Sequence, residues 1–522
     1  MLPKALVHFV AFATVAAHPP HTPGESKGPI AHVKNGTLRG FDLPNVEQEL
    51  FLGVPFAQPP GLTFGEDCLT LDIVRPKQTG KHDKLPVFVW IYGGGFQAGS
   101  TADPRYNTSY IVNASVAINK PIIAVALNYR VGGWGIVASK EMLNDGALNI
   151  GLYDRRLALK WIHENIAAFG GDPDAVTIGG ESAGAFSVRY HLVGFDGQNE
   201  GLFRAAIMQS GTAIARPINA ISDLPTTYQP IYDNVTEAVG CSNTTTSLAC
   251  LRKLPYDDLF EAFATAVMTP VLDGDFLRHL PSQSYEQDLI ADVAIPVGSN
   301  TDKGTPTFFG PRGTLNTDAD FESFLSAQGY GLNTSTVQRL AELYPDHPEK
   351  GCPFNTGSER FERLGYQYKR GAAVVGDMVI ISGTRATAQY HSSRFPTYSY
   401  QFDQSPWNGI MELVATEAPV YATLYAEICY VFNIEPSASV NNTNWIGPYP
   451  EYYEFSNLMS RAWISFVHDL DPNHDCEMPE WPAYEFGKQN MVFKVGDTHV
   501  EKDGWRVEQL EFWKTIYSTL AT

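Results

Sequence analysis

The stretch AVTIGGESAGAFSVRYHLV, residues 175–193, decides the fold of this chain. A β-rich run over residues 175–180 leads into GESAG, Gly180 to Gly184, and a helix-compatible run follows over residues 185–193. GESAG matches the pattern G-x-S-x-G, which belongs on a sharp strand-to-helix turn that lifts the serine hydroxyl to the top of a sheet. So tight a turn requires glycine on both sides. We therefore expect Ser182 to be a catalytic nucleophile.

A glycine-rich turn upstream supports the same interpretation. Gly93, Gly94 and Gly95 follow the apolar run LPVFVWIY, residues 85–92. Consecutive glycines let backbone N–H groups face a developing oxyanion with no side chain in the way. We expect the N–H groups of Gly94, Gly95 and Ala183 to form an oxyanion hole with three donors. A phosphate-binding loop is disfavoured, because no G-K-[ST] is present and no G-x-G-x-x-G opens a helix.

Apolar runs alternate with helical stretches along the whole chain, which predicts a mostly parallel twisted sheet with helices on both faces. The strands are expected at residues 85–92, 121–129, 175–180, 203–211, 293–300 and 396–402. A helix is expected over residues 154–171, with Leu157, Trp161 and Ile162 on one face and two glycines at its end. The amphipathic tail, residues 505–520, should pack as a final helix. The predicted fold class is α/β.

The charge and the N-terminus indicate which partners and compartment to expect. The formal net charge of −20 repels phosphate backbones and anionic membranes, so no nucleic acid partner is expected. Lys4, an apolar run over residues 5–16 and small residues before His18 are typical of a signal peptide, residues 1–17. We therefore expect a secreted, extracellular protein with one catalytic domain over residues 18–522. No later segment is long and apolar enough for a membrane span.

Glycosylation motifs and cysteines agree with secretion. We expect N-linked glycans in surface loops at the N-x-Ser/Thr triplets, which begin at Asn35, Asn107, Asn113, Asn234, Asn243, Asn333 and Asn441. The 6 cysteines fit an oxidising compartment but are too few for a disulfide scaffold. Cys241 and Cys250 bracket a short polar loop that one bridge would close. Cys429 lies in an apolar run and is expected to be a small buried side chain.

Together these motifs resemble the type-B carboxylesterases and lipases, the group that includes the cholinesterases, and look closest to its fungal branch. The resemblance covers nearly the whole mature chain, most specifically in LGVPFAQPP, EDCLTLDIVRP, VWIYGGGFQAG, LNIGLYDRRLALKWIHENIAAFGGDP and TIGGESAG. It implies an α/β-hydrolase fold, an ester hydrolase with its oxyanion donors at Gly94, Gly95 and Ala183, and a disulfide between Cys241 and Cys250. The implied substrate is a small-molecule ester or related carbonyl compound, and no cofactor and no metal are expected.

The sequence departs from this family in three places. The family has several tens of residues between the blocks that here read LGVPFAQPP and EDCLTL, and this stretch usually carries the partner of Cys68, so we expect Cys68 to be unpaired. The family's catalytic acid, the Glu of N-x-D-E-G-[ST], matches Lys303. Its catalytic histidine, in H-x-x-E-I-x-[FY]-V-F, matches Leu424, three residues before Glu427. No histidine lies close enough in sequence to replace it.

Loss of the base makes three functions possible. A leucine cannot take the serine proton, and in a serine hydrolase the loss of this step costs about 10⁶-fold in kcat. The chain is then an ester hydrolase with an altered base, a non-hydrolytic enzyme (isomerase, cyclase or acyl transferase) of small-molecule biosynthesis, or an inactive binding module. An intact Ser182 with its oxyanion hole favours an enzyme, because both still polarise a carbonyl. One hypothesis for the altered base is a neutral Lys303, as in Ser-Lys pairs.

Overall fold

The computed structural model of the protein describes residues 28–57, 67–212, 218–264, 266, 268–305, 313–328, 330–405, 422–423, 425–435, 446–473 and 478–517. Several sequence-based predictions concern residues outside these ranges. They are the signal peptide over residues 1–17, the shortened junction at Pro60, the substituted base position Leu424 and the glycosylation site Asn441. These stay predictions.

A sheet of 11 strands crosses the described part of the chain, in the order β13-β12-β11-β10-β9-β8-β6-β7-β5-β4-β3. Its strands are β3 (Phe41–Leu43), β4 (Gln48–Pro55), β5 (Thr70–Pro76), β6 (Leu85–Ile91), β7 (Ile123–Leu127), β8 (Gly171–Glu181), β9 (Ala205–Gln209), β10 (Ile295–Asn300), β11 (Thr397–Phe402), β12 (Gln489–Phe493) and β13 (His499–Lys502). A separate hairpin joins β1 (Ile30–Val33) and β2 (Gly36–Arg39). All six predicted strands are present.

The strands from β12 to β7 are parallel, and antiparallel strands flank them at both edges of the sheet. All five residues of β7 are buried, as are the last five of β6. Strands covered on both faces read as continuous apolar runs, which explains why the sequence identifies them. The sheet therefore confirms the predicted α/β class, and its centre lies at β6 and β8.

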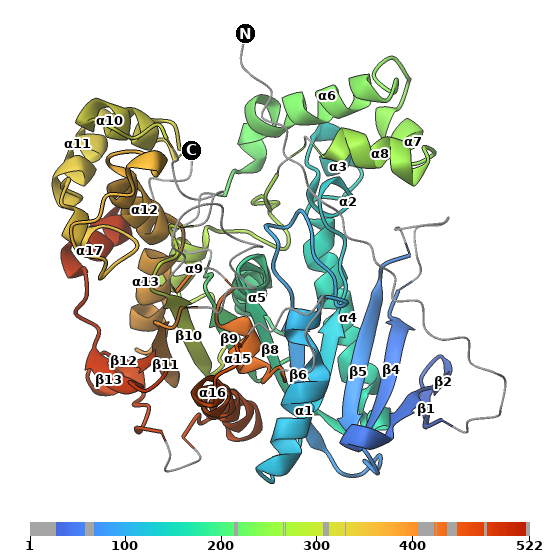
Figure 1. Ribbon diagram of the computed structural model, residues 1–522. Coiled ribbons are helices and arrows are strands. Elements are labelled where there is room, and N and C mark those ends of the chain that lie inside the picture. The colour runs from blue at the N-terminus through green and yellow to red at the C-terminus, as the bar shows by residue number, and fades with distance from the viewer. Residues whose placement is uncertain are drawn as a thin grey trace.

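Helices cover both faces of this sheet (Figure 1). Those before residue 200 are α1 (Thr108–Ala117), α2 (Gly133–Ile136), α3 (Lys140–Asn144), α4 (Ile150–Asn165) and α5 (Ala183–Val193). The others are α6 (Gln229–Ala238), α7 (Ser247–Leu251), α8 (Tyr256–Phe263), α9 (Pro281–Glu286), α10 (Asp318–Ser326), α11 (Thr334–Leu343), α12 (Tyr368–Gly376), α13 (Ser382–His391), α15 (Ile428–Val431), α16 (Pro450–Asp469) and α17 (Val507–Ile516). α1 and α16 contact each other in front of the sheet in this view.

The predicted helix over residues 154–171 forms as α4, but its expected apolar face is partly wrong. Leu157 is 43% exposed, whereas Leu152, Leu159 and Ile162 are fully buried. The helix begins at Ile150, earlier than expected, and the face it turns to the core follows a spacing of three to four residues from Leu152. Leu157 lies off this face. The predicted C-terminal helix forms as α17.

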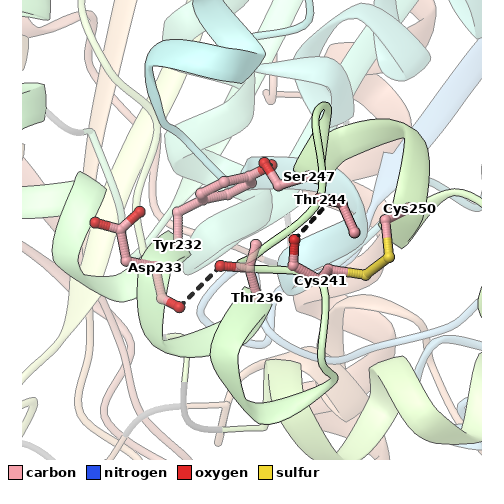
Figure 2. Close-up of a disulfide and its surroundings, with 7 residues drawn as sticks. All are labelled: Tyr232, Asp233, Thr236, Cys241, Thr244, Ser247 and Cys250. Carbon is pink, nitrogen blue, oxygen red and sulfur yellow. Dashed lines mark hydrogen bonds between the residues drawn. A yellow bond between two sulfur atoms is a disulfide. The ribbon is translucent and has the colours of Figure 1, made fainter.

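The disulfide implied by the family resemblance is formed: Cys241 and Cys250 are bonded, with their Cα atoms 5.7 Å apart (Figure 2). It closes the loop between α6 and α7. Thr244 Oγ1 donates to the carbonyl of Cys241 at 2.7 Å, which ties the loop to the bridge. Among the described residues Cys68 carries a free thiol, as predicted, and Cys429 is fully buried.

All six glycosylation-motif asparagines within the described ranges are exposed. The prediction that they lie in loops is wrong for two of them, because Asn113 belongs to α1 and Asn234 to α6. Asn107 and Asn333 are helix N-caps whose side chains accept backbone N–H groups. The side chains are therefore accessible, and their glycosylation stays a prediction.

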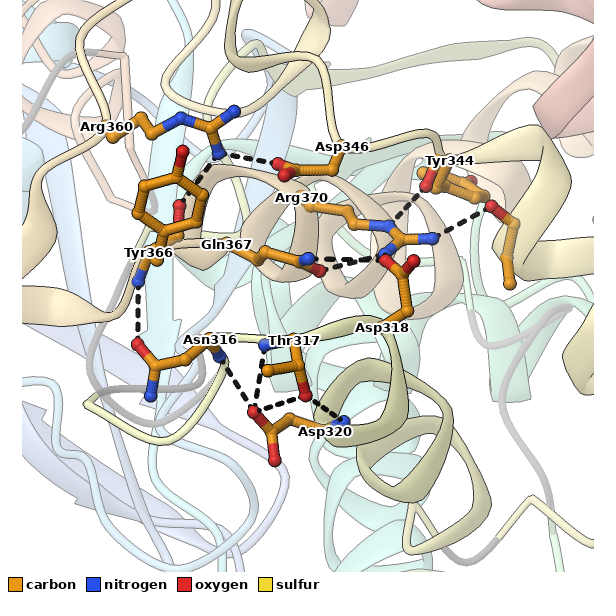
Figure 3. A network of polar contacts seen from close by, with 11 residues as sticks. Asn316, Thr317, Asp318, Asp320, Tyr344, Asp346, Arg360, Tyr366, Gln367 and Arg370 are labelled. Carbon is orange, nitrogen blue, oxygen red and sulfur yellow. Dashed lines mark hydrogen bonds and ion pairs between the residues drawn. The ribbon is translucent and has the colours of Figure 1, made fainter.

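A polar network joins α10, α11 and α12 (Figure 3). The Arg370 guanidinium on α12 donates to Asp318 at 2.7 Å and to the carbonyl of Ala341 at 2.9 Å. Thr317 and Asp320 form a capping box at the start of α10. The buried side chain of Arg370 on α12 therefore links this helix to α10 and α11.

Candidate active site

The turn predicted to carry the nucleophile lies between β8, which ends at Glu181, and α5, which begins at Ala183. Ser182 is the single residue between them, with φ 54° and ψ −121°. A serine in this region of conformational space is strained, and such strain is found where a fold holds a functional side chain. The backbone N–H of Ser182 donates to the carbonyl of Gln209 at 3.0 Å, which fixes the turn to β9.

Both glycines of the motif are required, because any side chain at these positions would clash with backbone atoms. A Cβ added to Gly184 would lie 2.0 Å from the carbonyl oxygen of Ile91, and one added to Gly180 would lie 2.7 Å from the same oxygen. Backbone atoms cannot yield as a flexible side chain can. The motif G-x-S-x-G is therefore explained by the approach of β8 and α5 to the end of β6.

The glycine-rich turn after β6 reaches the nucleophile. A Cβ added to Gly93 would lie 3.1 Å from the Cβ of Ser182, so the turn passes directly beside the serine. Gly94 and Gly95 have φ values of 112° and 65°, which favour glycine. Ala183 is the first residue of α5, and a helix offers no internal partner to its first N–H groups. The structure thus brings together the segments proposed to form the oxyanion hole.

Lys303, at the position of the family's acid, lies beside the motif's glutamate. Its Nζ is 3.7 Å from Oε1 of Glu181, and neither side chain is exposed. Burial lowers the pKa of Lys303, while the carboxylates of Glu427 and Glu181 act in the opposite direction. Burial raises the pKa of Glu181 well above its ordinary value, against the attraction of Lys303. The predicted acid position therefore carries a buried lysine beside Glu181, and the carboxylate of Glu427 also favours its charged form.

Glu427 completes this buried group. Asn300 Nδ2 donates to its Oε2 at 2.6 Å and also to the carbonyl of Thr423. The Ser210 hydroxyl lies 3.5 Å from its Oε1. These contacts bring the ends of β9 and β10 to the residues just before α15, so the polar group spans three segments distant in sequence.

Sequence reasoning missed Tyr425. The Arg105 guanidinium carbon lies 5.0 Å from the centre of its ring. Burial raises the pKa of Tyr425, the charge of Glu181 adds to this, and Arg105 opposes it. The available signal was its position directly after Leu424, where a side chain that replaces the histidine would be sought.

Two of the described histidines, His391 and His468, have partners of their own in the fold. His391 is fully buried at the end of α13, where its ring contacts the Tyr285 hydroxyl at 3.0 Å and the Val293 carbonyl at 2.8 Å. Burial lowers its pKa to about 4. His468 lies near the end of α16 and contacts the carboxylate of Asp469.

The described residues form neither a metal site nor a membrane-spanning helix. Within these ranges, no three His, Cys, Asp or Glu side chains are grouped so that they could hold a metal ion. None of the described helices is both long and apolar enough to span a bilayer.

A strand–serine–helix turn on a mostly parallel sheet with helices on both faces defines an α/β-hydrolase. A solved structure supports this fold: Aspergillus niger EstA matches with a TM-score of 0.80 at 23% identity, covering 95% of this chain and 99% of its own. The sequence model of the carboxylesterase family matches residues 61–513. The chain belongs to the carboxylesterase family.

Secreted fungal enzymes are among its relatives. Secreted lipase 1 of Botryotinia fuckeliana is 36% identical over 86% of this chain and 76% of its own length. Lipase 4 of Diutina rugosa is 35% identical over 82% of this chain and 74% of its own. The secreted triacylglycerol lipase LIP1 of Gibberella zeae is 33% identical over 88% and 76%.

Proposed function

We propose that the protein is a secreted carboxylic ester hydrolase in which Ser182 is the nucleophile. The observation that carries this proposal is the strained Ser182 between β8 and α5, with Gly93 of the glycine-rich turn directly against it. A fold has no reason to keep such strain for a solvated serine. The named activities of the relatives support an acyl ester as substrate.

The oxyanion hole is assigned to the backbone N–H groups of Gly94, Gly95 and Ala183. In the reaction the Ser182 oxygen bonds to the ester carbonyl carbon, and the carbonyl oxygen gains the negative charge that these donors stabilise. Collapse of this intermediate expels the alcohol and leaves an acyl-serine, which water then hydrolyses. The positions Lys303 and Leu424 mean that this chemistry proceeds without the family's acid and base.

A fluorophosphonate probe tests the nucleophile. We expect covalent labelling of the wild-type chain and none of Ser182→Ala, together with hydrolysis of p-nitrophenyl butyrate by the wild type alone. Ser187→Ala is a matched control, because Ser187 is a buried serine on α5 that donates to the carbonyl of Ala183. It should label and hydrolyse as the wild type does. An unlabelled, inactive wild type would exclude serine-ester chemistry.

Secretion and glycosylation belong to the same proposal. The signal peptide over residues 1–17 and the accessible asparagines of the glycosylation motifs support it, as do the names of two secreted relatives. N-terminal sequencing of the exported chain should begin at His18. Treatment with an N-glycosidase should lower its mass, and an unchanged mass would exclude N-linked glycans.

A further inference from the structure

The residue that precedes the glycine-rich turn is locked to the residue that follows the next strand of the sheet. Tyr92 lies between β6 and Gly93, and its ring stacks on that of Tyr129, with the ring centres 4.3 Å and the planes 16° apart. The Tyr129 hydroxyl donates to the carbonyl of Tyr92 at 2.7 Å, and the Tyr92 hydroxyl donates to the carbonyl of Tyr129 at 3.2 Å. The two tyrosines therefore fix the point at which the turn begins.

Phe96, directly after the three glycines, is held in a costly conformation. Its φ is 65°, in the left-handed region that is unfavourable for an aromatic residue. Its carbonyl accepts the backbone N–H of Gly132 at 2.7 Å, and its buried ring lies 6.4 Å from the ring of Tyr190 on α5. Such a conformation persists only where the surrounding structure holds it. The packing around Phe96 therefore fixes the point at which the turn ends.

One buried side chain lies against both of these points. The guanidinium carbon of Arg155, on α4, is 3.4 Å from the ring centre of Tyr129 and 5.5 Å from that of Phe96. Its Nη1 donates to the carbonyl of Gly151 at 2.7 Å, which anchors the group to its own helix. A cation over an aromatic ring is held more strongly where water is excluded, and Arg155 is only 1% exposed.

The charge of Arg155 has no carboxylate beside it among the described residues. The neighbouring acid Asp154 pairs with Arg130, and the next arginine, Arg156, pairs with Glu200. The Arg155 Nε has no hydrogen-bond partner in the described part of the chain. A buried charge that is not neutralised nearby acts over several ångströms, because little water screens it. Arg155 therefore places a positive charge behind the glycine-rich turn.

We propose that Arg155 is a positioning residue for the oxyanion hole. The inference rests on the proposed ester hydrolase function. The guanidinium packs on Tyr129, which locks the start of the turn, and on Phe96, which ends it. Between these points lie Gly94 and Gly95, two of the proposed donors. Arg155 keeps these donors in place and adds a positive field where negative charge develops on the ester carbonyl oxygen.

Arg155→Met removes the charge and the planar group but keeps an unbranched buried side chain. We expect kcat for p-nitrophenyl butyrate to fall by about 10- to 100-fold, because a small displacement of the donors weakens the transition state. KM should stay within about twofold, since the carbonyl oxygen of the bound ester carries little charge. Titration with the fluorophosphonate probe gives the number of reactive sites, so that kcat is expressed per site.

A charged analogue gives a second measurement that a loss of folded protein would not change. Butylboronic acid forms a negatively charged tetrahedral adduct with a serine nucleophile and so imitates the intermediate. Its inhibition constant should rise by about tenfold or more in Arg155→Met. If the substitution merely reduces the amount of folded protein, the remaining sites keep the kcat and the inhibition constant of the wild type, and the positioning role is wrong.

Arg155→Lys keeps the charge and tests the role if Arg155→Met does not fold. An ammonium group cannot stack on two rings as a guanidinium does, so kcat should fall by about threefold to tenfold, less than in Arg155→Met. KM should again be unchanged. Wild-type kcat and wild-type boronic acid affinity in Arg155→Lys would overturn the proposal.

Arg156→Met is the matched control. Arg156 follows Arg155 on the same helix and is also buried, with its guanidinium carbon 5.3 Å from the ring centre of Phe195 and an ion pair to Glu200 at 2.9 Å. Its replacement also removes a buried arginine from α4, but away from the turn. It should keep the wild-type kcat and boronic acid affinity per labelled site, and losses equal to those of Arg155→Met would overturn the positioning role.

The two proposals fail in different ways. A wild type without Ser182-dependent hydrolysis or labelling overturns the ester hydrolase function, and the role of Arg155 falls with it. A wild type that hydrolyses the ester, together with an Arg155→Met variant that is unaffected per labelled site or loses only in KM, overturns the role of Arg155 and leaves the function standing.

Discussion

Lys303 Nζ lies 3.7 Å from the Oε1 of Glu181, which directly precedes the proposed nucleophile Ser182, and both side chains are fully buried. Transfer of either charge out of water costs free energy that only the partner offsets. Glu427 provides a second buried carboxylate for the same ammonium group. The lysine at this position therefore interacts with two buried acidic side chains.

The first prediction concerns this ion pair. Lys303→Met leaves Glu181 without its cation and should lower the free energy of unfolding by about 3–5 kcal/mol. The double variant Lys303→Met/Glu181→Gln removes both charges and should recover a large part of this loss. Chemical denaturation followed by tryptophan fluorescence measures both.

The control for Lys303 is an exposed pair. Lys160 Nζ lies 3.1 Å from Glu200, and both side chains are nearly half exposed. Lys160→Met should change the free energy of unfolding by less than about 1 kcal/mol. Equal losses of unfolding free energy in Lys303→Met and Lys160→Met would contradict the prediction that breaking the buried pair is more destabilising.

The fold could be predicted from sequence because its decisive signals are local. β6 and β7 are buried on both faces and therefore apolar throughout, and GESAG between a β-rich run and a helix-compatible run marks the turn. The error at Leu157 has the same origin. One helical face was chosen from the residues of α4 alone, whereas the sheet it packs on decides which face is buried.

Sequence patterns predict the turn of the candidate site, but not the polar side chains that surround it. Ser182 and the glycines are fixed by short patterns whose spacing reflects a tight turn. The contact of Lys303 with Glu181 joins segments far apart in sequence, and no pattern within either segment predicts the partner. A pairing of this kind follows from the topology that brings the carboxyl ends of β8 and β10 to one edge.

The second prediction tests the space around the nucleophile turn. Gly184→Ala places a Cβ 2.0 Å from the Ile91 carbonyl, so the turn must move. We expect a loss of about 3 kcal/mol or more in stability and no fluorophosphonate labelling. Gly80→Ala is the control, because its Cβ would meet only Asp83, at 3.7 Å, and stability should change by less than about 0.5 kcal/mol. Wild-type labelling of Gly184→Ala would contradict the account of the motif.

The third prediction concerns the disulfide. Cys241 and Cys250 are 9 residues apart in sequence, and the bridge restricts the unfolded chain over this short loop. Their replacement by alanine should lower the free energy of unfolding by about 2–3 kcal/mol, measured as a shift in the denaturation midpoint. Cys68→Ala, which removes a free thiol, is the matched variant and should leave stability nearly unchanged. A reversed order of the two effects would contradict the prediction.

The last prediction is a pH dependence that originates at His391. Its folded-state pKa of about 4 lies below the ordinary value of 6.5, because burial disfavours the charged ring more strongly than the hydrogen bond to the Val293 carbonyl favours it. Above pH 6.5 the imidazole is neutral in the folded and unfolded states alike, and its contribution to stability is complete. As pH falls from 6.5 toward 4, the unfolded state binds a proton that the folded state does not, so stability is lost.

The loss of stability depends on the difference between the folded-state and unfolded-state pKa values of His391. At about 1.4 kcal/mol per pH unit, the loss reaches about 3 kcal/mol by pH 4. The difference in unfolding free energy between wild type and His391→Gln should shrink by this amount over the window, since the variant has no imidazole to protonate. His82→Gln, at an exposed position, should give a curve parallel to that of the wild type. Parallel curves for His391→Gln would mean that the buried imidazole does not resist protonation, and the assignment of His391 as a neutral structural side chain would fail.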